Sequence, residues 1–215
     1  MARKTFIEQM EELRIRIWNA NEDPVIKPRL NIYFTDEKLQ QGQTLWNEAD
    51  ALNKQQDTEL NEQKAATDEL NNMRETVEQN LERDKKVARV ALRGNGAAFD
   101  SLNLKELVPT RLEDLIYDGE QFYANLLGNT EWATAMQNFG YTTEGLTANQ
   151  QHAATLRNLQ EKRQREMGDA QQATKDKWGK YEELKAFDRD LKEIARIEFE
   201  NDPQLLEKLG ILVRS

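Results

Sequence analysis

The sequence contains no cysteine and a single histidine, His152. The absence of cysteine excludes disulfides, thiolate-ligated zinc and thiol catalysis. The residue three positions before His152 is Asn149, so the Glu-x-x-His motif of di-iron helical bundles is missing. Because a catalytic site needs several convergent groups, we expect His152 to be structural or to lie on the surface.

Long hydrophobic runs are missing as well. No stretch approaches the roughly 18 apolar residues of a membrane-spanning helix. Residues 1–6 lead into a charged segment without the apolar region of a signal peptide, so we expect a cytoplasmic protein with no membrane partner. The net charge of −9 argues against a nucleic-acid partner, since such binding depends on Lys and Arg neutralising phosphates.

Proline and glycine are scarce, with 4 and 10 residues respectively. Charged residues make up 32% and hydrophobic residues 38% of the chain, which predicts a thin core and a largely helical fold. Residues 35–93 and 142–200 contain no proline, and each segment reads as helix throughout. An unbroken helix of roughly 58 residues would be about 87 Å long.

Apolar residues recur at a spacing near 3.5 toward both ends of these segments, whereas the middles are polar. Two structures fit this pattern. One is a pair of long antiparallel, coiled-coil-like helices with a slim middle. The other breaks the segments near 55–61 and 162–168, which gives two hairpins and a compact bundle. Gly168 supports a break, since an interior glycine costs roughly 1 kcal/mol, but the first segment has no breaker there, and we favour long helices.

The chain aligns with itself when it is shifted by 107 residues. Residues 31–104 then match 138–211 without a gap, with 14 identities in 74 positions. The segment 87–90, Val-Ala-Arg-Val, falls opposite 194–197, Ile-Ala-Arg-Ile, and the helix breakers at 94–96 fall opposite 201–203. We predict an internal duplication with repeats at 1–104 and 105–215, which together form one structural unit.

Each repeat follows the same predicted plan. A first helix opens with a capping box, formed by Thr5 with Glu8 in the first repeat and by Thr110 with Glu113 in the second. A connector, the long helix and a short closing element follow. The predicted first helices cover 5–20 and 111–127, and the closing elements cover 96–104 and 203–210.

Few residues stand out as candidates for chemistry. Arg89 and Arg196 recur at matching places, and are candidates for binding an anion or a partner. The alternative is that each pairs with a carboxylate such as Glu37 or Glu144 while its stem covers apolar surface. The Gly94–Gly96 segment resembles a phosphate loop, but no strand precedes it and it reads as a helix end. We expect most of the aromatic residues, which recur at helical spacing, to be core. We assign no catalytic, cofactor-binding or metal-binding residue.

Three segments carry a resemblance to a known group of proteins. They are Ala170-Gln171-Gln172-Ala173-Thr174, Ile194-Ala195-Arg196-Ile197 and the segment 203–211, Pro-Gln-Leu-Leu-Glu-Lys-Leu-Gly-Ile. They resemble an uncharacterised bacterial family of internally duplicated, all-helical proteins. The resemblance implies a bacterial, intracellular source and the duplication. It implies no activity, cofactor or catalytic residue.

These observations predict an all-α fold. We expect an internally duplicated helical bundle with long antiparallel helices, related by a pseudo-two-fold axis. The leading hypothesis for function is a non-enzymatic scaffold or protein-interaction protein without a cofactor, bound to a protein partner or to a second copy of itself. The alternative is a small-ligand binding protein or enzyme, with a pocket between the two repeats lined by aromatic residues and by Arg89 and Arg196.

Overall fold

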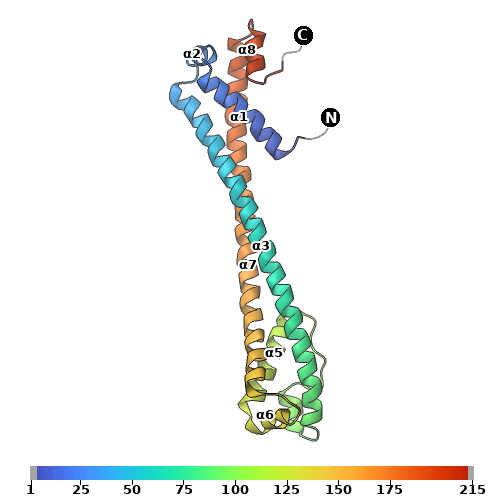
Figure 1. Ribbon diagram of the computed structural model, residues 1–215. Coiled ribbons are helices and arrows are strands. Elements are labelled where there is room, and N and C mark those ends of the chain that lie inside the picture. Colours follow the sequence, from blue (N-terminus) through green and yellow to red (C-terminus); the bar gives the residue numbers. More distant parts are fainter. Residues whose placement is uncertain (1–3, 213–215) are drawn as a thin grey trace. The chain divides into compact units, whose positions relative to one another are not determined.

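A computed structural model describes residues 4–212 of the chain. These residues form eight helices and no strand (Figure 1), which confirms the predicted all-α class. In chain order the helices are α1 Phe6–Glu22, α2 Ile26–Leu30, α3 Asp36–Ala91, α4 Gly96–Ser101, α5 Leu112–Gly128, α6 Thr130–Gln137, α7 Thr143–Glu198 and α8 Pro203–Lys208.

The two long helices, α3 and α7, contain 56 residues each and run without interruption (Figure 1). The prediction of unbroken helices is therefore confirmed, and the alternative with breaks in the middle of each segment is wrong. Gly168 does not interrupt α7, because a cost of roughly 1 kcal/mol is small for a helix held by packing at many other turns.

The helix starts differ from the prediction at one place. The capping box at Thr5 is confirmed: Glu8 donates its backbone N–H to the Thr5 hydroxyl, and its carboxylate accepts from the Thr5 backbone N–H. The box at Thr110 is wrong, because α5 begins one residue later than expected, with Arg111 as its N-cap and no side-chain cap. Arg74 donates to the Thr110 carbonyl at 2.6 Å, which holds this residue outside the helix.

The chain divides into two compact units. The first comprises Met1–Leu60 and Asp169–Ser215, and the second comprises Asn61–Gly168. The boundaries between the units fall in the polar middles of α3 and α7, so the polar middles mark a change of packing and not a break in either helix. Each unit contains residues from both predicted repeats.

The first unit combines α1, α2 and the start of α3 with the end of α7 and α8. Residue numbers run in opposite directions along α3 and α7 here: Glu48 pairs with Lys180 and Gln56 with Thr174, both at 3.0 Å. The largest fully buried side chains of its core are Ile17, Ile26, Leu30, Phe34, Leu39 and Phe199.

Gly42 of α3 allows a close approach of α7 in this unit. A Cβ atom placed on Gly42 would lie 2.3 Å from Cε1 of Phe187. The Phe187 ring is buried and packs edge-on against Phe34, with ring centroids 5.7 Å apart. The two long helices can therefore enclose the ring here only because position 42 has no side chain.

The second unit combines the end of α3 and α4 with α5, α6 and the start of α7. Here too residue numbers run in opposite directions along the long helices, with Glu69 paired to Lys162 at 2.9 Å and Asn80 bonded to Asn149 at 3.1 Å. The largest fully buried side chains are Leu81, Lys85, Leu102, Leu104, Phe122 and Tyr123.

Several of the aromatic residues expected in the core are buried, namely Phe122, Tyr123, Phe187 and Phe199. Partly buried Trp18, Trp46 and Trp132 pack against the core clusters. Trp178 is an exception, because it is 46% exposed. It lies edge-on to Phe6 and Tyr181 at centroid distances of 5.7 and 5.6 Å.

Candidate functional site

The most buried carboxylate of the second unit is that of Asp84 on α3, which has 0% exposure. Its Oδ1 accepts from Tyr141 Oη at 2.8 Å and from Arg83 Nε at 3.2 Å. Its Oδ2 accepts from Tyr123 Oη at 2.8 Å and from Asn149 Nδ2 at 2.9 Å. A carboxylate has about four lone-pair sites, so the protein itself occupies all of the acceptor capacity of Asp84.

The tyrosines in this cluster act only as donors. Burial raises the pKa of Tyr123 well above its ordinary value, and the Asp84 charge adds to the effect. Burial and the bond to Asp84 also raise the pKa of Tyr141. Both hydroxyls therefore stay protonated at neutral pH, and they tie α5 and the α6–α7 connection to α3.

A second buried pair lies beside this cluster. Lys85 of α3 donates to Asp118 of α5 at 2.6 Å and 2.8 Å, and to the Asn103 carbonyl at 3.2 Å. An ammonium group has three donors, so Lys85 is saturated too. Asn103 also donates to Asp118 at 3.2 Å, and it has a φ of +49°. Asn103, with its left-handed backbone, thus connects Lys85 of α3 with Asp118 of α5.

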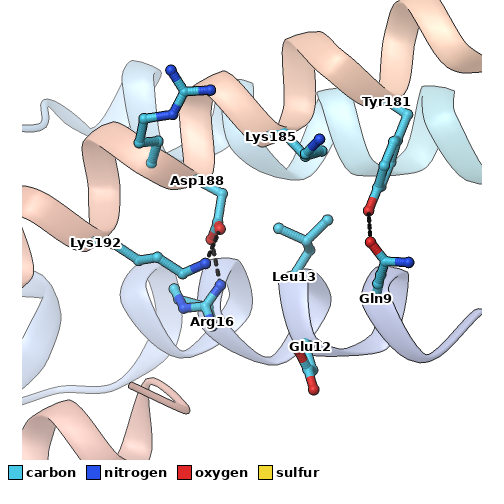
Figure 2. A pocket seen from close by; sticks show the side chains of 9 residues that line it. Gln9, Glu12, Leu13, Arg16, Tyr181, Lys185, Asp188 and Lys192 are labelled. Carbon is cyan, nitrogen blue, oxygen red and sulfur yellow. Dashed lines mark hydrogen bonds and ion pairs between the residues drawn. The ribbon is translucent and has the colours of Figure 1, made fainter. Parts of the chain in front are cut away.

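The first unit contains a pocket of about 270 Å³ between α1 and α7 (Figure 2). Its walls carry four basic and two acidic side chains together with polar and apolar ones. The lining residues are Gln9, Glu12, Leu13 and Arg16 of α1 and Tyr181, Lys185, Asp188, Arg189 and Lys192 of α7.

Arg16 and Asp188 form the buried centre of this pocket. Arg16 donates from Nη1 to Asp188 Oδ1 at 2.5 Å and from Nε to the Leu209 carbonyl at 3.1 Å. Lys192 pairs with Asp188 Oδ2 at 2.6 Å, and Figure 2 shows both cations directed at this carboxylate. Arg16 is only 4% exposed, and its Nη2 has no hydrogen-bond partner among residues 4–212. This centre, unlike the Asp84 cluster, keeps unused hydrogen-bonding capacity.

The two arginines singled out from the sequence lie in different units. Arg89 belongs to the second, where it donates from Nε to the Leu104 carbonyl at 2.6 Å and from Nη2 to the Glu106 carbonyl at 3.0 Å. Its partners are thus backbone carbonyls of the segment after α4, and not a carboxylate such as Glu37 or Glu144. Arg196 belongs to the first unit and is exposed. Whether either residue binds an anion stays a prediction.

His152 lies half-buried on α7 in the second unit. Its Nδ1 is buried and has no hydrogen-bond partner among the described residues. A half-buried position on the helix is compatible with the structural or surface role that the sequence predicts. The Gly94–Gly96 segment ends α3, with Gly94 at a φ of +88° and Asn95 capping α4, so its interpretation as a helix end is confirmed.

Comparison with protein-family models, with curated proteins and with solved structures found no match to this chain. Among the residues that the structure describes, none of the helices combines the length and the apolar character needed to cross a bilayer.

Proposed function

We propose that this chain is a helical scaffold or protein-interaction protein and not an enzyme. The observation that carries the proposal is the saturation of the buried charges in the second unit. Asp84 accepts four hydrogen bonds from the protein, and Lys85 donates three. A substrate would find neither a free lone pair on Asp84 nor a free N–H on Lys85. We therefore assign these groups the role of holding helices together.

An internal duplication, related by a pseudo-two-fold axis, is part of the proposal. The bounds of α3 and α7 differ by 107 residues at both ends, and so do those of α4 and α8. The same shift pairs buried core positions, among them Leu39 with Leu146 and Val77 with Leu184. Each unit is built from the first part of one repeat and the last part of the other. This common plan supports two copies of one ancestral segment.

The expected partner is another protein or a second copy of the chain, and we expect neither nucleic acid nor membrane as a partner. Long exposed polar faces on α3 and α7 offer surface for such a contact. Exposed aromatic side chains at Tyr33, Tyr117 and Phe139 offer sites with more binding energy per residue, since aromatic residues are enriched at interfaces. We also propose that the protein is bacterial and cytoplasmic.

Site-specific photo-cross-linking in the native cell tests this function. A benzophenone amino acid replaces Tyr33, Tyr117 or Phe139 one at a time, and the exposed polar positions Gln41 and Gln121 serve as matched controls. The expected result is a cross-linked product of constant mass from at least one aromatic position. Absence of a product from every position, together with a monomeric mass by light scattering, would overturn the proposal.

A second candidate function is small-ligand binding, which the pocket between α1 and α7 favours. That pocket is lined by α1 of the first predicted repeat and α7 of the second, as the alternative from the sequence required. Its lining differs from the expected one, because Tyr181 is the only aromatic residue in it and neither Arg89 nor Arg196 takes part.

A further inference from the structure

We propose that the pocket between α1 and α7 in the first unit binds a small anion that carries a phosphate group. The inference rests on the second candidate function, small-ligand binding, and names its ligand class. The residues that would hold the anion are Arg16, Lys185, Arg189 and Lys192, all of which line the pocket.

The charge of the pocket is opposite to that of the chain. Four basic residues face two acidic ones, Glu12 and Asp188, which leaves an excess of two positive charges in a chain with a net charge of −9. A phosphate monoester carries a charge of about −1.5 to −2 at neutral pH. The local excess therefore matches the charge of one bound phosphate group.

The donors of the pocket are arranged for an anion with several oxygens. Arg16 reaches the pocket from α1, whereas Lys185 and Lys192 stand two helical turns apart on α7. Buried Arg16 keeps Nη2 without a partner in the described residues. Lys185 pairs with the exposed Glu182 on its own helix and lies 5.4 Å from the ring centroid of Tyr181, and such a surface ion pair contributes little. Donors from opposite walls suit the three terminal oxygens of a phosphate group better than one planar carboxylate.

The second unit contains a pocket that can be compared with the proposed anion site. Under the proposed duplication, Lys185 and Arg189 of the first pocket correspond to Glu78 and Glu82, which line a pocket of the same volume, about 270 Å³. Lys192 corresponds to Lys85, whose three donors are already used within the protein. Two more basic residues line the second pocket, but Lys86 pairs with Glu82 and Arg89 donates to backbone carbonyls. The charge is thus reversed at two corresponding positions, which are basic in the first pocket and acidic in the second. A structural role alone gives no reason for this reversal at two positions, whereas an anion site in the first unit explains it.

Isothermal titration of the full chain with pyrophosphate at low ionic strength tests the inference. The decisive variant is the double substitution Lys185→Glu and Arg189→Glu, which copies the charges of the second pocket at two positions that are not buried. The matched control is Lys54→Glu with Lys175→Glu, which makes the same change of charge on exposed residues of the first unit outside the pocket. Circular dichroism checks that both variants remain helical.

The expected result is saturable binding with one site per chain, weakened at least tenfold in the pocket variant and less than threefold in the control. Absence of saturable binding to the unmodified chain would overturn the inference, as would equal weakening in both variants, which would indicate non-specific attraction. Citrate provides the carboxylate arm: binding of citrate as tight as that of pyrophosphate would contradict the phosphate class. Failure of this titration leaves the cross-linking result unaffected, so the two proposals can fail separately.

Discussion

Substitution of Gly42 by alanine should destabilise the first unit, although alanine favours helices more than glycine does. The new Cβ atom would lie 2.3 Å from Cε1 and 2.5 Å from Cζ of Phe187. The ring cannot simply turn away, because it is buried and packs against Phe34. The substitution therefore forces either the ring or the helix to shift.

The magnitude follows from two opposing contributions. Overpacking of a core costs about 1–3 kcal/mol, and replacing an interior helical glycine by alanine gains about 1 kcal/mol. Gly42→Ala should therefore lower the free energy of unfolding by about 0–2 kcal/mol. Phe187→Ala alone should lower it by about 3–5 kcal/mol. In that background the clash is gone, so Gly42→Ala should become stabilising by about 1 kcal/mol.

Urea unfolding of the four chains measures this reversal of sign. Tryptophan fluorescence is a suitable signal, since Trp18, Trp46 and Trp178 lie in the first unit and only Trp132 lies in the second. Gly179→Ala serves as control, because a Cβ at this position of α7 would meet nothing within 4 Å. It should stabilise both backgrounds equally. Equal stabilisation of the unmodified chain by Gly42→Ala and Gly179→Ala would refute the packing argument.

Three further predictions concern the caps, the recurring arginines and the buried tyrosine. Thr5→Ala should lower the free energy of unfolding by about 1 kcal/mol through loss of the capping box, whereas Thr110→Ala should change it by less than about 0.5 kcal/mol; similar values from denaturant titration would contradict the assignment. Arg89→Ala should cost about 1–3 kcal/mol, because two backbone carbonyls lose a charged donor, and exposed Arg196→Ala should be neutral within about 0.5 kcal/mol; the reverse order would contradict the contacts described. Because burial raises the pKa of Tyr123 in the folded state, the stability that this hydroxyl contributes is complete below its ordinary pKa of about 10 and is lost as the pH rises above it. Tyr123→Phe should therefore flatten the loss of stability between about pH 9 and 11, and an unchanged slope would show that this tyrosine does not control it.

The helical framework could be predicted from the sequence because it depends on local signals. The absence of proline predicts both long helices, and Gly140 and Gly210 end their helices at φ values of +84° and +67°. The start of α5 could not be predicted correctly, because Thr110 is held by Arg74, 36 residues earlier in the chain. The Thr110 and Glu113 spacing is right for a capping box, but the box does not form because of this long-range contact.

The candidate sites were less accessible to sequence reasoning. Asp84 falls on the apolar spacing of its helix, which is a signal for a buried charge, but its partners Tyr123 and Tyr141 lie on other segments. Arg16 and Asp188 are 172 residues apart, and no local pattern connects them. The recurring arginines, in contrast, are visible in the sequence, yet Arg89 donates to the backbone carbonyls of Leu104 and Glu106 and not to a carboxylate.

The central claim is that this chain acts by contacting another protein chain. The most direct measurement is photo-cross-linking from position 117 in the native cell, where Tyr117 of α5 is exposed, compared with the exposed polar control at Gln121. The account predicts a product of one defined mass at the aromatic position and little or none at the control. No product at Tyr117, Tyr33 or Phe139, with a monomeric chain in solution, would contradict it.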